Sequence, residues 1–250
     1  MLDVRGLRVE FDGFRAVDDV SLNVAAGSIV GIAGTNGAGK STLFAAIAGQ
    51  VTPSHGSIAF DGHPVTRLAP SARARLGLAR TFQIPREFGR LTVLENLLAA
   101  APSAHETLRA AWFARAAARR EEAEIARRAD EVLALVGLAV VRDRIAANLS
   151  GGQKKLLELG RTLMRTPKCL LLDEPFAGVN PVLVEQLLHV LRAIHARGIA
   201  LVVIEHHLQV LSSLVPRLIV MDQGRVIADG APAVVLQDER VQAAYMGGVV

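Results

Sequence analysis

The chain has 250 residues and a formal net charge of +4 at pH 7, and 51% of its residues are hydrophobic while 21% are charged. This length suits one large α/β domain, or one domain with an inserted lobe, and the apolar content can form a sizeable core. The apolar runs are far shorter than the ~20 residues that a membrane-spanning helix needs, which excludes such helices despite the mean hydropathy of +0.33. No basic and then apolar stretch opens the chain, so we expect no signal peptide.

A single cysteine, Cys169, excludes an intrachain disulfide, and its place in an apolar run predicts a buried, inert thiol. Arginines gather between Arg109 and Arg144, where they are interleaved with alanine and glutamate. A basic face of this kind can bind nucleic acid or anionic lipid. The near absence of aromatic residues favours a solvated helix face instead, so we expect no nucleic-acid partner.

Apolar and polar residues alternate over residues 2–28, which predicts antiparallel strands. A continuous apolar run, Ile29–Ala33, predicts a buried strand that leads into a glycine-rich turn. A helix is expected from Lys40 to Gly49, because a terminal glycine suits a helix C-cap. Further short strands are expected around Ser57–Phe60.

Helical spacing of leucines replaces the strand pattern over residues 84–163, which we interpret as a helical lobe inserted into an α/β core. The longest helix is expected over Thr107–Val136, a segment rich in alanine, arginine and glutamate. Within it, Glu124 and Arg128 are spaced for a favourable i,i+4 ion pair.

The α/β pattern resumes after Pro167. Strands that alternate with helices of this length predict a parallel sheet. We therefore expect one domain over residues 1–250, in which residues 1–83 and 164–250 form the core and a β subdomain. The expected elements are strands over Cys169–Leu172, Ala200–Ile204, Leu218–Met221 and Val226–Ala228, and a helix over Pro181–Arg197.

Residues 34–41 match the phosphate-loop pattern G-x4-G-K-[ST], between an expected strand and an expected helix. Glycines let backbone N–H groups turn toward phosphate oxygens, and the helix N-terminus adds its positive dipole end. The Lys40 amine can reach the β- and γ-phosphates, and the Ser41 hydroxyl can bind Mg²⁺. A chance glycine-rich turn is disfavoured by the two flanking elements. The candidate nucleotide-binding residues are Gly34, Thr35, Asn36, Gly37, Ala38, Gly39, Lys40, Ser41 and Thr42.

An apolar run, Leu170–Leu172, ends in two adjacent carboxylates, Asp173 and Glu174. A parallel strand directs its C-terminal end toward the ligand crevice. Asp173 is therefore expected near the metal ion, and Glu174 is placed to polarise the attacking water as a general base. Two surface acids at the end of a strand are common, but a phosphate loop in the same chain favours the functional interpretation.

The segment Leu149–Gln153 reads LSGGQ and precedes another expected helix, which starts near Lys154. A serine can cap that helix and two glycines allow close backbone approach, so its N-terminus forms a second anion site. One chain rarely needs two such sites for one nucleotide. We infer that these residues contact the γ-phosphate of ATP bound to another copy; they are Ser150, Gly151, Gly152 and Gln153.

The phosphate loop, LSGGQ and the LLLDEP segment occur in the order found in ABC transporters, and over essentially its whole length the chain resembles their ATP-binding subunits. The resemblance implies an α/β P-loop NTPase fold, the ABC nucleotide-binding domain with an antiparallel β subdomain and an inserted α-helical subdomain. It also implies ATP and Mg²⁺ as cofactors, and a head-to-tail dimer that encloses two ATP molecules. The second ATPase subunit is either an identical chain or a paralogue.

The resemblance assigns roles to further residues. Gln83 falls at the Q-loop glutamine, which touches Mg²⁺ and the attacking water, so it joins Ser41 and Asp173 as an expected metal contact. His206 resembles the switch histidine that contacts the γ-phosphate, and His207 is the alternative.

Phe11 aligns by spacing with the aromatic residue that stacks on adenine, and Phe14 is the alternative. Ordinary strand packing would also explain either phenylalanine. Asn180 stands where the D-loop of the family more often has an aspartate. The asparagine keeps the capacity for hydrogen bonding but lacks the negative charge.

Several stretches narrow the resemblance to the ATP-binding subunit of branched-chain amino acid importers. They are Leu78–Gln83, Leu91–Leu97, Glu174–Pro181 and Gln242–Gly247, together with the long helical lobe. Importers of urea or short amides and the ATPase of lipopolysaccharide export are the alternatives within transporters. A soluble ABC ATPase acting on nucleic acid and a regulator that does not hydrolyse ATP are the alternatives outside them.

The resemblance implies two separate transmembrane permease subunits and, indirectly, an extracytoplasmic solute-binding protein. The chain would then sit peripherally on the cytoplasmic face of the membrane. A groove after Gln83, with Ile84, Phe88 and Leu91, is expected to receive a permease helix. Ordinary packing within the lobe is the alternative for each of these apolar residues.

Overall fold

The computed structural model describes residues 1–81, 87–102 and 115–246, and it divides the chain into two compact units. The first unit holds the phosphate loop and the paired carboxylates, and the second holds the LSGGQ segment. The first comprises Met1–Gln83, Pro167–Gly178 and Leu191–Val250, and the second comprises Ile84–Thr166 and Val179–Val190.

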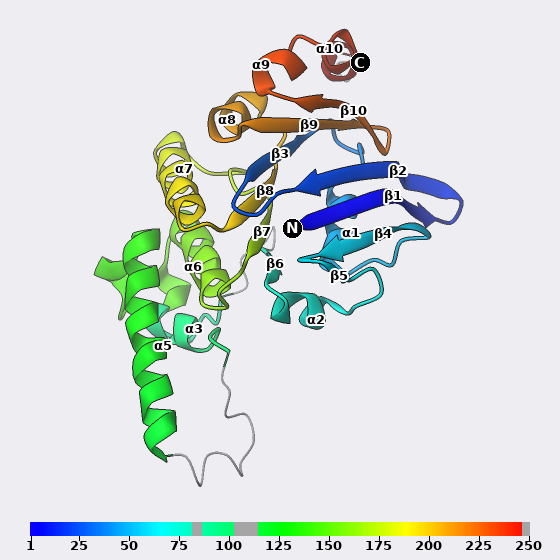
Figure 1. Cartoon of the computed structure of the whole chain (residues 1–250). Coiled ribbons are helices and arrows are strands. Elements are labelled where there is room, and N and C mark those ends of the chain that lie inside the picture. Colours follow the sequence, from blue (N-terminus) through cyan, green and yellow to red (C-terminus); the bar gives the residue numbers. More distant parts are fainter. Residues whose placement is uncertain (82–86, 103–114, 247–250) are drawn as a thin grey trace. The chain divides into compact units, whose positions relative to one another are not determined.

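A six-stranded sheet runs through the first unit in the order β10-β9-β3-β8-β7-β6 (Figure 1). The strands from β9 to β6 are parallel, and β10 pairs antiparallel with β9 at the edge. Every residue of β3, β7 and β8 is buried, which explains why their sequences are continuous apolar runs. The predicted parallel sheet is confirmed; its strands are β3 (Ile29–Ala33), β6 (Leu78–Arg80), β7 (Cys169–Asp173), β8 (Ala200–Ile204), β9 (Arg217–Asp222) and β10 (Arg225–Gly230).

A second sheet of the same unit is antiparallel and has the order β2-β1-β4-β5. Its alternating buried and exposed residues give the two-residue period that predicted it. A tight hairpin joins β1 to β2 and pairs Phe11 with Phe14 at its end. The strands are β1 (Leu2–Phe11), β2 (Phe14–Val24), β4 (His55–Phe60) and β5 (His63–Pro64).

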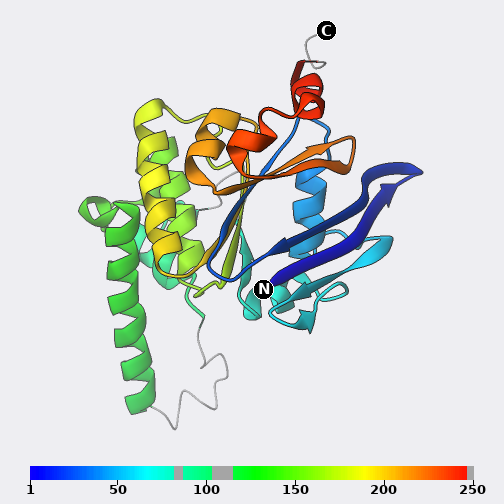
Figure 2. The same cartoon turned by 45° about the horizontal axis from the view of Figure 1, so that its top comes forward.

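Helix α1 (Lys40–Ala48) packs against strands of both sheets and so joins them in one core (Figure 2). It ends as predicted, at Gly49 in the left-handed conformation. Helix α8 (Leu208–Leu214) packs on β3 at Gly31, where a Cβ atom would lie 2.9 Å from Cγ of Leu211. The shorter helices of this unit are α2 (Pro70–Arg75), α9 (Pro232–Val235) and α10 (Glu239–Met246).

The second unit is helical. Its helices α3, α5 and α6 pack against one another, and Gly160 of α6 allows the close approach, since a Cβ there would lie 3.1 Å from Leu97. The expected long helix is observed over its C-terminal part, while residues 103–114 lie outside the described residues. The helices are α3 (Val93–Leu98), α5 (Arg115–Val136) and α6 (Gly151–Leu163), and α7 (Pro181–Ala196) is shared between the two units.

The predicted ion pair of Glu124 with Arg128 does not form as a direct contact, although the two charges attract each other. The carboxylate of Glu124 accepts instead from Nε of Arg127 at 3.0 Å, and Arg127 also pairs with Glu131. Arg128 donates to the carbonyl of Leu163 at 2.8 Å, at the C-terminal end of α6. The C-terminal end of a helix carries partial negative charge and attracts cations. Here the C-terminal end of α6 binds Arg128, which the i,i+4 spacing had paired with Glu124.

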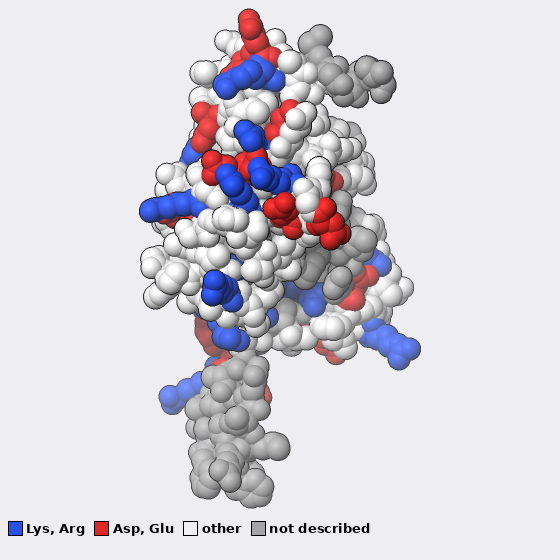
Figure 3. All heavy atoms as spheres, turned by 90° about the vertical axis from the view of Figure 1, so that its right-hand side faces the viewer, with Lys and Arg blue, Asp and Glu red and all other residues white. Residues whose placement is uncertain are grey.

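Cys169 is fully buried in β7, as predicted, and burial raises the pKa of its thiol to about 12, so few thiolates form at neutral pH. No helix in the described part of the chain is long and apolar enough to cross a membrane. Lys and Arg side chains are interspersed with Asp and Glu on the face that Figure 3 shows. Some of the exposed charges form ion pairs, among them Lys168–Asp61 and Arg5–Asp3, and each such pair stabilises the fold only slightly.

Candidate functional site

The phosphate loop joins β3 to α1 and is closely packed against two neighbouring backbones. A Cβ atom on Gly34 would lie 2.2 Å from the carbonyl oxygen of Met221, at the end of β9. A Cβ atom on Gly39, whose φ is +91°, would lie 2.2 Å from the carbonyl oxygen of Ala16 on β2. Only glycine fits both positions, so packing as well as phosphate binding requires these two glycines.

Replacing Gly39 by alanine is expected to lower the melting temperature well beyond the effect of Gly37→Ala. Both glycines have a left-handed φ, so both variants carry a backbone cost of about 1–2 kcal/mol. Nothing lies within 4 Å of a Cβ on Gly37, whereas one on Gly39 would overlap the Ala16 carbonyl oxygen. Thermal unfolding followed by circular dichroism measures the difference, and equal losses for the two variants would contradict the close contact.

The side chain of Lys40 lies beneath the phosphate loop and bonds to its backbone. Its ammonium group donates to the carbonyl of Gly34 at 2.7 Å and to that of Thr35 at 2.8 Å, and the residue is only 6% exposed. Burial lowers the pKa of Lys40, and the nearby carboxylates of Glu174 and Asp173 oppose that shift. The cation is therefore held under the loop, between its carbonyl groups and the acidic end of β7.

The N-terminus of α1 has no side-chain cap, because Gly39 stands at the N-cap position. The first N–H groups of a helix lack backbone partners and carry partial positive charge. Ser41 is exposed and Thr42 half-buried beside them. Exposed Asn36 and Gly37 complete a concave set of donors suited to phosphate oxygens.

Asp173 ends β7 and its side chain is only 5% exposed. One carboxylate oxygen, Oδ2, accepts from Nη2 of Arg80 at 2.6 Å. Arg80 also donates to the side chain of Gln50, which follows α1, so a single guanidinium group connects three segments of the site. No role was predicted for Arg80, because in the sequence it is only a charged residue near apolar ones, three positions before Gln83.

Glu174 lies in the left-handed region with φ of 48°, a conformation that costs a non-glycine residue on the order of 1–3 kcal/mol. Its N–H group donates to the carbonyl of Ile204 at 3.0 Å, and its own carbonyl accepts from Ala177 at 3.1 Å. These bonds turn the chain sharply where β7 ends. Strain of this kind concentrates at functional sites, where the surrounding structure holds it in place.

A cavity of about 890 Å³ brings the phosphate loop and the predicted switch histidine together. Gly34, Thr35 and Asn36 line it together with His206. Helix α10 lines another part, with Arg240 and Tyr245, neither of which was predicted to lie near the phosphate loop. Burial raises the pKa of Tyr245 to about 12.

His207 lies beside His206, with the two ring centroids 4.0 Å apart, and it occupies the N-cap position of α8. It does not line the cavity. This arrangement favours His206 for a contact with a group bound at the phosphate loop, as the spacing in the sequence predicted.

The two phenylalanines of the hairpin are both exposed: Phe11, the last residue of β1, is 47% exposed, and Phe14, the first residue of β2, is 67% exposed. Both rings are therefore open to a planar ligand, and the choice of Phe11 over Phe14 stays a prediction. The hairpin is next to the phosphate loop, because Ala16 of β2 contacts Gly39.

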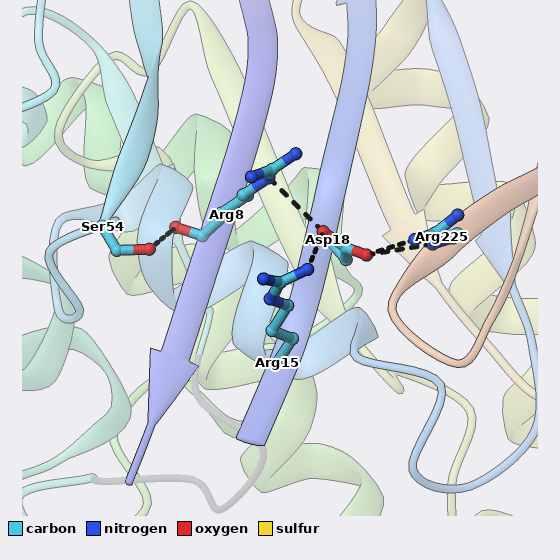
Figure 4. Close-up of polar contacts among 5 residues, drawn as sticks. All are labelled: Arg8, Arg15, Asp18, Ser54 and Arg225. Carbon is cyan, nitrogen blue, oxygen red and sulfur yellow. Dashed lines mark hydrogen bonds and ion pairs between the residues drawn. The ribbon is translucent and has the colours of Figure 1, made fainter. Parts of the chain in front are cut away.

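A charged cluster ties this hairpin to the edge of the six-stranded sheet (Figure 4). Asp18 of β2 accepts from Nη2 of Arg225 on β10 at 2.6 Å, and this bond is the main reason that the pKa of Asp18 is lowered. Arg8 and Arg15 approach its other oxygen at 3.4 and 3.7 Å. The N–H of Asp18 also donates to the carbonyl of Gly224, so side chain and backbone together fix the strand that precedes the loop contact.

The LSGGQ segment forms the N-terminus of α6 in the second unit. Ser150 caps the helix, as predicted, by accepting from the N–H of Gln153 at 3.2 Å, while Gln153 accepts from the N–H of Ser150 at 3.1 Å. A Cβ atom on Gly152 would lie 2.2 Å from Leu183 of α7, so packing requires that glycine. Asn180 accepts from the N–H of Leu183 at 2.9 Å, which shows what an uncharged residue at the D-loop position does locally.

The segment after the Q-loop is also part of the second unit, although Gln83 and Ile84 lie outside the described residues. Asn96 is fully buried and makes hydrogen bonds to both backbone groups of Phe88. The ring of Phe88 is 49% exposed and lies 4.6 Å from the guanidinium carbon of Arg161. An aromatic residue held by its backbone with its ring at the surface suits contact with a partner.

The sequence model described as "ABC transporter" matches residues 17–177 of this chain. The chain belongs to the ABC transporter ATPases. A second model, described as "Branched-chain amino acid ATP-binding cassette transporter", matches residues 225–250.

Similar proteins cover the chain from end to end. It is 37% identical to the probable branched-chain amino acid transport ATP-binding protein LivG of Archaeoglobus fulgidus, over 99% of this chain and 95% of that protein. It is 35% identical to the lipopolysaccharide export system ATP-binding protein LptB of Escherichia coli, over 98% of this chain and 97% of that protein. A crystal structure of an ATP-binding cassette of an ABC transporter in its ADP conformation matches with a TM-score of 0.85 and 35% identity, over 99% of this chain and 98% of the other.

As an ABC ATPase subunit of a transporter, the chain binds and hydrolyses ATP. No group of three or more His, Cys, Asp or Glu side chains that could hold a metal occurs among the residues the structure describes. Ser41 in the phosphate loop and Asp173 at the end of β7 both offer oxygen donors near Lys40, and Mg²⁺ binds through one or two protein oxygens together with substrate phosphates. The residues present therefore fit Mg²⁺ that arrives with the nucleotide.

Proposed function

We propose that this chain energises the import of branched-chain amino acids, or of a related small solute, through a separate membrane permease. The observation that carries the proposal is the likeness to branched-chain amino acid ATPases over the whole chain, together with the match of residues 225–250 to their C-terminal model. Lipopolysaccharide export is the second candidate, because LptB proteins match at 33–35% identity over nearly the whole chain.

ATP binds with its phosphates on the loop of residues 34–42 and its adenine on Phe11. Ser41, Gln83 and Asp173 would hold Mg²⁺, which would supply charge neutralisation at the phosphates of the bound nucleotide. Lys40, buried under the loop, balances the remaining phosphate charge. The strained turn at Glu174 presents its carboxylate as the base that takes a proton from the attacking water. Gln83 is expected to contact the same water. His206, which lines the same cavity as the phosphate loop, donates a hydrogen bond to the γ-phosphate.

Two copies, or this chain and a paralogue, enclose two ATP molecules head to tail. Ser150, Gly151, Gly152 and Gln153 of one subunit complete the phosphate site of the other, since the capped N-terminus of α6 exposes Ser150 and Gly151. Binding energy at this shared site closes the dimer, and hydrolysis reopens it.

Two permease subunits receive this motion at the segment that follows Gln83. Phe88, held by Asn96 and exposed beside Arg161, is the described residue best suited to contact a permease helix. The ATPase is then peripheral, on the cytoplasmic face of the membrane, and an extracytoplasmic solute-binding protein delivers the solute.

Co-purification of the permease, followed by ATPase assays with candidate solutes, tests the proposed function. Stimulation by leucine, isoleucine or valine is expected, and stimulation by lipopolysaccharide alone would replace it with the second candidate.

Replacing Phe88 by alanine is expected to weaken co-purification of the permease by about 10-fold, as loss of an aromatic anchor from an interface does. ATP hydrolysis by the isolated chain should remain, because Phe88 makes no described contact with the phosphate loop. Val140→Ala is the matched control, since Val140 is 95% exposed in the same unit. Equal retention of the permease by the Phe88 and Val140 variants would exclude Phe88 from the interface.

A further inference from the structure

Glu205 is a buried carboxyl group that none of the roles above uses. It follows β8, is 0% exposed, and its N–H group donates to the carbonyl of Ile32 at 3.2 Å. A buried ionisable group is weak support for stability, because an apolar residue of similar volume often serves as well or better. Its position beside His206, which lines the cavity with the phosphate loop, therefore points to a task in the reaction.

One oxygen of Glu205 holds the turn that carries Glu174. Oε1 accepts from the N–H of Phe176 at 2.8 Å. Pro175 has no N–H group, so Phe176 provides the first backbone donor after Glu174. Glu174 itself has a φ of 48°, and a conformation of this kind persists only where neighbouring contacts hold it.

The other oxygen faces the proposed switch histidine. Oε2 is buried without a hydrogen-bond partner and lies 3.8 Å from Nδ1 of His206. That separation is longer than a hydrogen bond, and a small rotation of the imidazole would close it. The side chain of His206 is 41% exposed and lines the cavity with the phosphate loop, and His207 contacts its ring with the two centroids 4.0 Å apart.

We propose that Glu205 is a positioning residue whose carboxyl group holds the Glu174 turn with one oxygen and the His206 imidazole with the other. The proposal rests on the roles of Glu174 and His206 in the proposed function. Orientation of a functional histidine by a hydrogen bond at its second nitrogen is a general device, since that bond determines which nitrogen carries the proton.

A shared proton explains why a carboxyl group suits this position. If the proton is on Oε2, it is donated to Nδ1, and the neutral imidazole carries its hydrogen on Nε2. If the proton moves to Nδ1, the imidazolium ion again carries hydrogen on Nε2. In both arrangements Nε2 remains a donor for the γ-phosphate. Burial is the main reason that the pKa of Glu205 is raised, the Glu174 charge adds to that effect, and His206 and His207 oppose it.

Two substitutions separate positioning from a merely structural role. Glu205→Leu removes both hydrogen bonds, and kcat for ATP is expected to fall by about 10- to 100-fold, as when the partner of a functional histidine is removed. KM for ATP should stay at the wild-type value, because the phosphate loop is untouched. The melting temperature should fall, because the buried N–H group of Phe176 loses its acceptor, and Glu205→Gln should restore it. Glu205→Gln can accept from Phe176 with its oxygen and donate to Nδ1 with its amide, so it should retain most of the wild-type kcat.

The link through His206 is tested with the double variant Glu205→Leu, His206→Ala. If Glu205 acts through His206, adding Glu205→Leu to His206→Ala should lower kcat far less than it does in the wild type. Nitrogen chemical shifts of His206 in the purified protein report its protonated nitrogen independently of turnover. They should indicate hydrogen on Nε2 in the wild type and the Gln variant, and a mixture of tautomers in the Leu variant.

Three results would overturn the proposal: wild-type kcat in the Leu variant, equal losses in the Leu and Gln variants, or fully additive effects with His206→Ala. Wild-type ATP hydrolysis in the Glu174→Gln or His206→Ala variant would instead count against the roles that the proposed function gives to these two residues. The ring nitrogen shifts would still decide whether Glu205 orients His206, so the two failures are distinguishable.

Discussion

Replacement of Glu174 by glutamine is expected to reduce ATP hydrolysis by about 100-fold or more, because a positioned general base contributes a factor of this order. Glutamine keeps the shape of the side chain. It can also adopt the same strained backbone conformation, in which the N–H group of residue 174 donates to the carbonyl of Ile204. ATP binding should therefore remain. With binding intact and hydrolysis blocked, the ATP-bound dimer should accumulate, and size-exclusion chromatography with and without ATP measures it alongside kcat.

The control for this experiment is Glu185→Gln, which makes the same chemical change at an exposed position of α7. It should hydrolyse ATP at the wild-type rate. A Glu174→Gln variant that hydrolysed ATP normally would show that Glu174 is not the base. Loss of ATP binding together with hydrolysis would mean that the carboxylate supports the turn rather than the chemistry.

Replacement of Lys40 by alanine is expected to weaken ATP binding by about 10- to 100-fold, since hydrogen bonds to charged groups contribute about 1.5–3 kcal/mol and each 1.4 kcal/mol is tenfold. The structure adds a second reason. The ammonium group also donates to the carbonyls of Gly34 and Thr35, so its removal leaves two loop carbonyls without that donor. Titration with a fluorescent ATP analogue measures the affinity, and the rise in melting temperature with ATP provides an independent readout.

Lys168→Ala is the matched control, because it removes a lysine whose side chain is 57% exposed and pairs only at the surface with Asp61. Exposed ion pairs contribute at most about 1 kcal/mol, so this variant should bind ATP like the wild type. Equal ATP affinities in the Lys40 and Lys168 variants would contradict a phosphate-binding role for Lys40.

Local signals in the sequence were enough for the elements that carry the chemistry. The strand Ile29–Ala33 matches β3 residue for residue, and α1 starts at Lys40 and is capped at Gly49 as expected. The cap of α6 by Ser150 was likewise predictable, because a helix N-cap and its partner three residues on interact within one turn. The helix itself begins at Gly151, three residues before its expected start.

Side-chain partners beyond the local motif were not predictable in the same way. Arg80 and Asp173 are 93 positions apart, and Phe176 and Glu205 are 29 apart. Helix α10 lines the cavity beside the phosphate loop, although the two segments lie at opposite ends of the chain. Even for neighbours on one helix the local expectation failed: Arg128 of α5 donates to the carbonyl of Leu163 on α6 and makes no direct contact with Glu124.

The sequence by itself determined the phosphate loop, the strand that ends in Asp173 and Glu174, and the capped LSGGQ helix, because each depends on contacts within a few residues. Only the tertiary structure decided which groups support them: Arg80 at Asp173, the Ala16 carbonyl at Gly39, and Glu205 between Phe176 and His206. Such contacts depend on which strands become neighbours in the sheet, and strand order is a property of the whole fold rather than of any segment.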